Sequence, residues 1–139
     1  MIQLVAHYIF NLADRDAASA RALLRAGMWG VEADESHGGS LAAGDLALVY
    51  LAAPERMFIG RAELASPVHE WTPAEARAFP GDSPGGVLLA HVDEWDPPVP
   101  MSAVLAQIDP SNKAKADFDA GVVRITDGEY ETAVAVAGA

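Results

Sequence analysis

The chain has 139 residues, 51% of them apolar, which is enough material for one hydrophobic core and not for two. Its 20 acidic and 9 basic residues give a formal net charge of −11, which repels polyanions and works against a broad nucleic-acid-binding surface. The absence of cysteine excludes disulfides, thiolate metal sites and cysteine nucleophiles, and it is compatible with a cytoplasmic location. We therefore expect one cytoplasmic domain over residues 1–139.

The first segments predict two strands separated by a helix. Leu4–Phe10 is rich in β-branched and aromatic residues, lacks a basic region and is too short to span a bilayer, so we interpret it as a strand and expect no membrane segment. A helix with apolar residues at helical spacing follows, capped by Asp14 or Asp16 and ending at Gly27. Met28–Val31 then forms a short strand that carries a tryptophan between two glycines.

The clearest structural signal is Leu41–Leu64, which predicts a β-hairpin. Gly44-Asp45 is typical of a turn, Leu46–Leu51 is an almost continuous apolar run, and Met57–Leu64 alternates as a half-buried strand does. Gly60 lies inside this second arm, where a glycine indicates a bulge or the close approach of another backbone.

The second half of the chain predicts two more strands, three helices and a stiff connector. In order, they are a short helix opened by a capping box at Thr72–Glu75, a buried strand at Val87–Val92, an acidic rim at Asp93–Asp96 that closes this strand, an extended connector at Pro97–Pro100, a helix at Met101–Ile108, a strand at Val122–Ile125, and a last helix with a capping box from Thr126 to Val136. Short strands with irregular connections favour an α+β fold, a small mixed β-barrel of about five or six strands flanked by short helices.

Catalytic and metal-binding patterns are missing from the sequence. The four histidines, His7, His37, His69 and His91, have no metal-ligand spacing, and we interpret each as a structural histidine with satisfied hydrogen bonds. The loop serines lack a Gly-x-Ser-x-Gly context, and the acids at 93–96 are more typical of a solvated rim than of an acid and base pair. We therefore expect no catalytic residue, no metal and no cofactor.

Aromatic side chains at strand ends and in loops are the remaining candidates for a binding site. They are Phe10, Trp29, Tyr50, Trp71, Trp95 and Phe118. A flat ligand stacks on such rings, while a polar group such as Asn11 or Ser40 would read its edge. Trp95, between acids and prolines, is interpreted as a plug at a barrel end. Trp29, next to Gly30, is equally compatible with a core position and with a ligand wall.

Five segments occur in an order and spacing that are similar to those of a known family. They are the aromatic strand His7–Asn11, the Trp-Gly segment Met28–Val31, the Leu-x-x-Gly-Asp segment Leu41–Asp45, the strand Phe58–Glu63 and the capping-box helix at Thr126–Tyr130. Over nearly its whole length the chain thereby resembles the EVE domains, members of the PUA-like superfamily that also contains the YTH domains.

The resemblance implies a mixed β-barrel, no catalysis, and a pocket for a modified nucleobase in DNA or RNA. It puts Trp29 at the position of the family's pocket tryptophan, beside Asn11 and Gly30, and Phe118 at that of a late aromatic which closes the site. Trp71 and the segment Ser83–Val87 are similar to the YTH region that supplies a second wall. The full candidate set is Trp29, Asn11, Gly30, Phe10, Tyr50, Phe118, Trp71 and Arg124.

The acidic composition keeps other functions open. Affinity for nucleic acid comes largely from phosphate neutralisation, so strand binding should be weak unless Lys113, Lys115 and Arg124 gather on one face. The pocket would then serve a free nucleoside or another planar ligand. A small enzyme acting on a nucleoside, nucleotide or amide-type substrate, and an acidic domain that binds a basic protein, are the alternatives. The sequence does not indicate the base modification or the oligomeric state.

Overall fold

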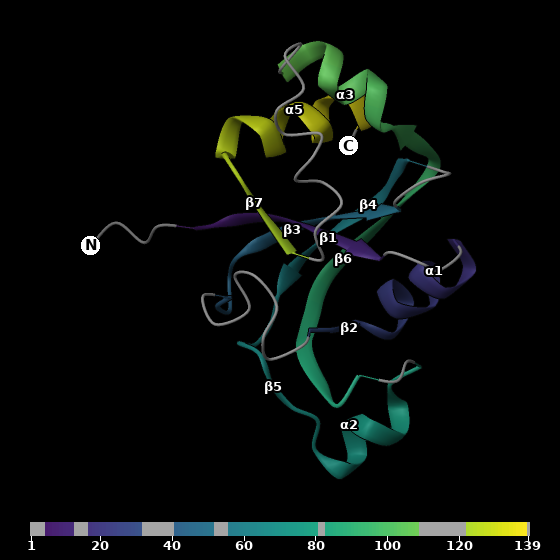
Figure 1. Cartoon of the computed structure of the whole chain (residues 1–139), viewed down its shortest axis with the longest axis vertical. Helices are drawn as coiled ribbons and strands as arrows, with labels where there is room; N and C mark the ends of the chain where they lie inside the picture. The colour runs from purple at the N-terminus through teal and green to yellow at the C-terminus, as the bar shows by residue number, and fades with distance from the viewer. Residues whose placement is uncertain are drawn as a thin grey trace.

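A mixed sheet of seven strands organises the residues that the computed structural model describes, which are 5–12, 17–31, 41–51, 56–80, 83–108 and 122–138. The strands are β1 (His7–Leu12), β2 (Met28–Gly30), β3 (Leu46–Leu51), β4 (Met57–Leu64), β5 (His69–Glu70), β6 (Gly85–Pro100) and β7 (Val122–Ile125). The helices in these ranges are α1 (Ala17–Ala26), α2 (Pro73–Ala78), α3 (Met101–Ile108) and α5 (Asp127–Ala137). Figure 1 shows α3 and α5 together at one end of the sheet, α1 beside β2 and β6, and α2 with β5 at the opposite end.

The strand order β2-β6-β4-β3-β1-β7 confirms the α+β class and corrects the predicted closure. β1 and β3 are parallel, and the other pairs are antiparallel. Within the described ranges, β2 and β7 lie at the two ends of this order and do not pair with each other. The sheet is therefore open and does not close into a barrel. The seventh strand, β5, pairs with β6 and was not predicted, because two residues are too few to show an alternating pattern.

Most predicted elements occur where local sequence signals are strong. The hairpin is confirmed as the antiparallel pair β3–β4, and α3 and β7 have the predicted bounds. Both capping boxes form: the backbone N–H of Glu75 donates to Thr72 Oγ1 (3.2 Å), and that of Glu129 donates to Thr126 Oγ1 (3.1 Å). The predicted caps of the first helix, Asp14 and Asp16, lie outside the described residues.

β6 is the main correction to the predicted elements. Its sixteen residues continue through the segments that were predicted as an acidic rim and a proline connector. The strand persists because β4 pairs with both of its halves, with Leu64 opposite Leu89 and Met57 opposite Pro100. No described strand pairs with the other edge of the second half, so prolines there remove no ladder hydrogen bond on that side.

Each face of the sheet carries a hydrophobic core, because strand side chains alternate between the two faces. One core, which we call the α1 cluster, lies between the sheet and α1 and includes Phe10, Leu24, Trp29 and Leu64. The other, which we call the α5 cluster, lies under α3 and α5 and includes Tyr50, Trp95, Val104 and Tyr130. Along β1, Tyr8 and Phe10 belong to the α1 cluster and Ile9 to the α5 cluster. Whether a strand residue points to one face of the sheet or to the other therefore decides which of the two cores it belongs to.

Asp45, a buried residue that is 6% exposed, connects the starts of β1 and β3 to the end of β4. Its Oδ1 accepts the backbone N–H of Ala6 (3.1 Å), and its Oδ2 accepts that of Ala42 (3.0 Å). The backbone carbonyl of Asp45 accepts the N–H of Leu64 at 2.8 Å. These bonds hold the ends of the three strands in place relative to one another.

Two glycines allow backbones to approach β6 closely. A Cβ on Gly86 would meet the carbonyl oxygen of Trp29, and a Cβ on Gly60 would lie 2.5 Å from the carbonyl oxygen of Asp93. The close approach predicted for Gly60 is thereby confirmed, and the β4–β6 register shifts on both sides of it. Any larger residue at these two positions would push strands apart.

We predict that Asp45→Asn lowers the free energy of unfolding by about 1–3 kcal/mol. The side-chain NH₂ of the asparagine would face a buried backbone N–H that has a carboxylate acceptor in the wild type. The matched control is Asp96→Asn, which changes an exposed carboxyl and should cost little. Urea unfolding followed by circular dichroism measures both. Equal stability of the two variants would contradict the role of Asp45.

We also predict that Gly86→Ala destabilises the fold by about 1–3 kcal/mol or more, because its methyl group would displace the Trp29 backbone. Gly128→Ala is the control, since a Cβ at this exposed helical position meets only Thr126 Oγ1, at 3.9 Å. That variant should be as stable as the wild type or up to about 1 kcal/mol more stable. Thermal unfolding of both variants compares them directly.

Candidate functional site

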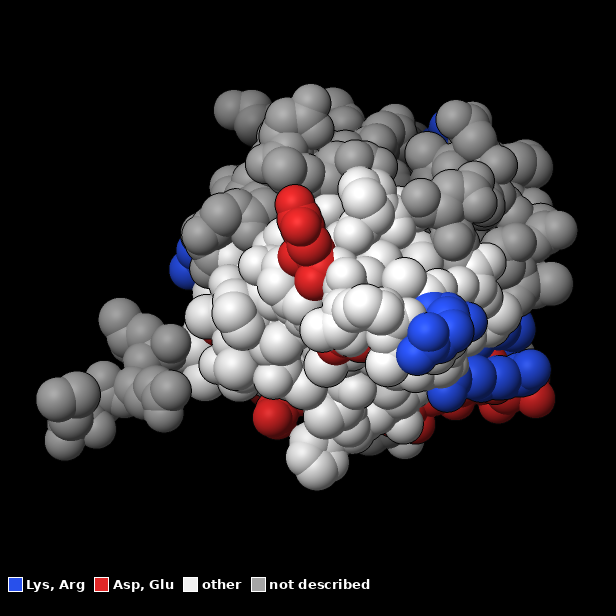
Figure 2. All heavy atoms as spheres, turned by 90° about the horizontal axis from the view of Figure 1, so that it is seen from below, with Lys and Arg blue, Asp and Glu red and all other residues white. Residues whose placement is uncertain are grey.

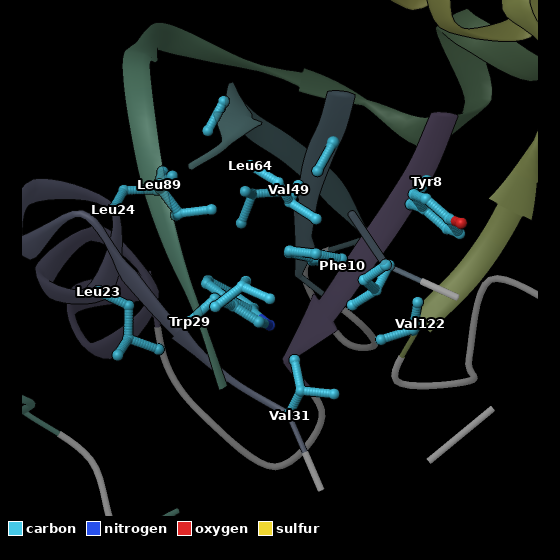
Figure 3. Close-up of a cluster of buried hydrophobic side chains, with 14 of the residues drawn as sticks. Tyr8, Phe10, Leu23, Leu24, Trp29, Val31, Val49, Leu64, Leu89 and Val122 are labelled. Atoms are coloured by element: carbon cyan, nitrogen blue, oxygen red, sulfur yellow. The ribbon is translucent and has the colours of Figure 1, made fainter. Parts of the chain in front are cut away.

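Trp29 and Phe10 form a stacked pair inside the α1 cluster. Their ring centroids lie 5.9 Å apart with an interplanar angle of 25°, and Figure 3 shows the two side chains pointing toward each other from β2 and β1. Trp29 is 2% exposed and Phe10 is fully buried. The structure thus brings together two predicted site residues, and it does so as core packing.

Asn11 and Tyr50 lie away from this pair. They are register partners on β1 and β3, and Tyr50 belongs to the α5 cluster, where its hydroxyl donates to Met101 Sδ (3.2 Å). Strand alternation puts the side chain of Asn11, which follows Phe10, on that same face. The structure therefore separates Asn11 and Tyr50 from the ring of Trp29.

Arg124 lies on β7, opposite Tyr8 of β1. Its guanidinium carbon is 5.6 Å from the centroid of the Tyr8 ring, a cation–π distance. Arg124 is exposed and lines a hollow of about 390 Å³ that also contains Asp127 and Glu129. These acids offset its charge. Phe118, the predicted closing aromatic, lies outside the described residues.

A second aromatic group, which we call the Trp71 platform, consists of His69, Trp71 and Phe79. Trp71 is half-buried, with its ring centroid 4.9 Å from that of Phe79. Its indole Nε1 donates to the carbonyl of Ser83 (2.9 Å), and its backbone N–H donates to that of Pro84 (3.0 Å). The ring is therefore accessible to solvent and fixed in orientation.

Gly30 connects this platform to the strand that carries Trp29. A Cβ on Gly30 would lie 2.8 Å from Ser83 Cβ and 3.1 Å from Phe79 Cζ. The missing side chain thus lets the segment that holds Trp71 pack on β2. Two predicted site residues, Gly30 and Trp71, are parts of one local arrangement.

His69 sits between two acceptors. Its Nδ1 is 3.0 Å from the carbonyl of Pro67, and its Nε2 is 3.0 Å from Glu75 Oε1. The Pro67 carbonyl, and then the Glu75 carboxylate, raise the pKa of His69 above its ordinary 6.5, against an opposing effect of burial. The pKa of Glu75 is lowered, first by the Thr72 backbone N–H and then by His69. The partly buried ring meets Trp71 edge-on, with centroids 5.6 Å apart.

Ser66 completes an arrangement that superficially resembles a hydrolase triad. Its Oγ lies 3.5 Å from His69 Nδ1, while His69 Nε2 contacts Glu75. The Nδ1 proton, however, points to Pro67, so this nitrogen offers no lone pair to activate the hydroxyl. Ser66 Oγ also accepts the backbone N–H of Leu88 (3.0 Å). These contacts join β5 to β6.

Basic side chains near β6 are neutralised by its acids. Glu94 pairs with Arg25 (3.1 Å) and Arg21 (3.5 Å), and Asp93 pairs with Arg61 (3.3 Å). The hydrogen bond from Arg25 lowers the pKa of Glu94. On the face drawn in Figure 2, most of the blue groups lie at the lower right next to red ones, and most of the described surface is neither acidic nor basic. The described residues on that face form no broad basic surface for phosphates, and Lys113 and Lys115 lie outside the described residues.

The other sequence interpretations have clear structural positions. Trp95 is buried in the α5 cluster, and its indole N–H donates to Asp93 Oδ2 (3.3 Å). His7 is buried with its Nε2 3.4 Å from Asp127, His91 is exposed, and His37 lies outside the described residues. Across the described ranges, three or more His, Cys, Asp or Glu never gather in a way that would hold a metal ion. The helices described there are all too short or too polar to cross a bilayer.

We predict that Trp29→Ala lowers the free energy of unfolding by about 3–5 kcal/mol, as truncation of a buried aromatic does. Trp71→Ala should lower it by no more than about 2 kcal/mol, since Trp71 is only partly buried. Urea unfolding of the two variants tests this difference. Comparable losses would mean that Trp71 is as much a core residue as Trp29.

No family model matches the chain, and neither does any curated protein at the level of sequence. Solved structures do match its fold. Rpa0253 from Rhodopseudomonas palustris has a TM-score of 0.66 at 20% identity, over 96% of this chain and 94% of that one. Human THYN1, in complex with DNA that contains 5-methylcytosine, has a TM-score of 0.64 at 12% identity, over 96% and 98%. An ASCH protein from Zymomonas mobilis has a TM-score of 0.58 at 13% identity, over 93% and 94%.

At these identities the likeness establishes a shared fold. The match extends over nearly the whole of each chain, so it concerns the complete arrangement and not one motif. The chain shares the α+β fold of these proteins.

Proposed function

We propose that this protein is a non-enzymatic binding module for a planar, base-like group, and that a modified nucleobase is its ligand. The observation that carries the proposal is the Trp71 platform, in which a partly buried tryptophan beside Phe79 is held by its indole N–H and by its backbone N–H. A ring fixed before binding loses little side-chain entropy when a ligand stacks on it. The shared fold with a protein solved in complex with 5-methylcytosine DNA supports the choice of nucleobase.

The charge of the chain favours a small or single-stranded ligand. Stacking of a base on an aromatic ring contributes about 1–3 kcal/mol and needs no phosphate contact. Duplex binding depends on phosphate neutralisation, whereas the arginines at β6 are paired with Glu94 and Asp93. We therefore propose a nucleoside, or a base presented by a short single strand of DNA or RNA, bound in a salt-sensitive way.

Trp29 has a different place in this proposal from Trp71. Its ring is covered within the α1 cluster, so a ligand that stacked on it would first have to displace core side chains. We assign the ligand contact to Trp71 and keep Trp29, with Phe10, as the predicted inner wall. Substitution of each ring separately decides between the two positions.

A hydrolase is the second candidate, because Ser66, His69 and Glu75 lie in a triad-like order. It would require His69 to leave the Pro67 carbonyl and accept the proton of Ser66. Turnover of a nucleoside or an N-acylated nucleoside, lost in Ser66→Ala, would establish this activity. Binding without product favours the module.

We predict that one modified nucleoside or short oligonucleotide quenches tryptophan fluorescence at low salt, and that Trp71→Ala weakens its binding about tenfold to a hundredfold. The weakening follows from the lost stacking surface. Calorimetry with a panel of modified and unmodified bases measures the affinities.

Trp95→Phe is the matched control, since Trp95 lies in the α5 cluster, away from the platform, and its replacement should leave affinity unchanged. Unchanged binding by Trp71→Ala together with lost binding by Trp29→Phe would move the site to the inner wall. If no base binds in any form, the proposed function is wrong, and basic protein partners become the next ligands to test.

A further inference from the structure

We propose that His69 is a pH-sensitive positioning residue for the Trp71 platform: its imidazolium form ties α2 to β5 and holds the Trp71 ring, and its neutral form releases them. The conformational part stands on the contacts of His69 alone. The consequence for binding, a loss of ligand affinity as the pH rises, rests on the proposed function.

The two acceptors around His69 require two ring protons. Pro67 O and Glu75 Oε1 both lie 3.0 Å from ring nitrogens, and neither oxygen can donate a proton to nitrogen at neutral pH. Only the imidazolium ion satisfies both contacts. A neutral ring would leave a nitrogen lone pair facing an oxygen, so one of the two contacts would be lost.

Helix α2 depends on this contact because little else holds it. It has six residues, and none of them is buried. Its described attachments are Phe79 at the C-cap, which packs against the α1 cluster, and Glu75 at the third helical position, which contacts His69. A segment with few buried contacts opens at low free-energy cost when one of them is lost.

Trp71 lies between the two partners of this ion pair. It follows β5, which carries His69, and directly precedes Thr72, the N-cap that exchanges hydrogen bonds with Glu75. The edge of the His69 ring also meets the Trp71 ring at 88°. Release of Glu75 would therefore loosen the backbone on one side of Trp71, and movement of His69 would remove a ring contact on the other.

The charges around His69 define the direction of the effect. From α2 the facing group is Glu75; on β5 itself the neighbouring charge is the exposed Glu70; and the β6 residues paired with β5, Gly85 and Gly86, do not titrate. The acids favour the imidazolium ion. The next basic residue, Arg77, is exposed in the last turn of α2.

The pH range follows from the two shifts. The pKa of His69 is raised in the folded protein. Its contribution to the attachment of α2 is therefore complete below pH 6.5 and is lost as the pH rises through the raised pKa. The pKa of Glu75 is lowered in the folded protein. Its contribution to the same attachment is complete above pH 4.5 and is lost as the pH falls through the lowered pKa. The platform is held fully between these two limits and is released on the alkaline side.

The experiment follows the indole N–H resonance of Trp71 in ¹⁵N-labelled protein from pH 5 to 8.5, with its signal identified from Trp71→Phe. We expect this resonance to shift in one titration with a midpoint above pH 6.5, and its exchange with solvent to accelerate above the midpoint. His69→Gln should abolish the titration. Glu75→Gln should lower the midpoint while keeping the capping box, because a glutamine oxygen accepts the same N–H.

Two controls separate this effect from general changes in the fold. His91→Asn removes an exposed histidine, and asparagine tolerates the positive φ of 50° at that position, so the Trp71 titration should persist. Glu129→Gln changes the equivalent glutamate of the α5 capping box, which has no histidine partner, and should leave the midpoint unchanged. A Trp71 resonance that does not shift with pH in the wild type, or one that still titrates in His69→Gln, overturns the proposal.

Measurement of ligand affinity at different pH values distinguishes the proposed role of His69 from the proposed function. Affinity for the best ligand of the nucleoside panel should fall at least tenfold between pH 6 and pH 8.5 in the wild type and stay constant in His69→Gln. Binding that does not change with pH overturns the regulation and leaves the proposed function intact. If Trp71 titrates with His69 but no base binds at any pH, the positioning role stands and the proposed function fails.

Discussion

The architecture depends on the buried carboxylate of Asp45. It accepts the backbone N–H groups of Ala6, just before β1, and Ala42, shortly before β3, and the backbone carbonyl of Asp45 accepts the N–H of Leu64 at the end of β4. A buried carboxylate is costly unless such donors surround it, so the parallel β1–β3 pairing and the β3–β4 hairpin are joined at one residue. Because the register of β1 is set there, so is the alternation that sends Phe10 to one core and its neighbours to the other.

That alternation divides the candidate site. Phe10 and Trp29 stack in the α1 cluster, whereas Tyr50 lies in the α5 cluster beside α3 and α5. The accessible aromatic surface lies elsewhere, where β5 and α2 hold Trp71 against the sheet through Ser83 and Gly30. Trp29, adjacent to a glycine in sequence, proves to be a core residue, whereas Trp71, whose sequence resemblance is looser, is only partly buried.

Local signals predicted much of the fold. Capping boxes, a Gly-Asp turn and apolar periodicity operate over a few residues, which is why α2, α3, α5, β7 and the hairpin were found. The length of β6 was not predicted, because acids and prolines are poor strand formers on their own and only pairing with β4 keeps them extended. For the site, Trp71 was among the predicted residues. His69, Glu75 and Phe79 were not, because neither the spacing between His69 and Glu75 nor the spacing between Trp71 and Phe79 is a recognised motif.

The sequence by itself determined an acidic composition, an α+β element order, the absence of cysteine chemistry, and a set of segments similar to EVE domains. These properties depend on composition and on short-range patterns. Tertiary structure alone decided that the sheet is open, that Asn11 and Trp29 face different cores, and that His69 lies between two acceptors. Each of these depends on contacts between segments that local preferences do not specify, because a strand's partner and the burial of its side chains are set by the packing of the whole chain.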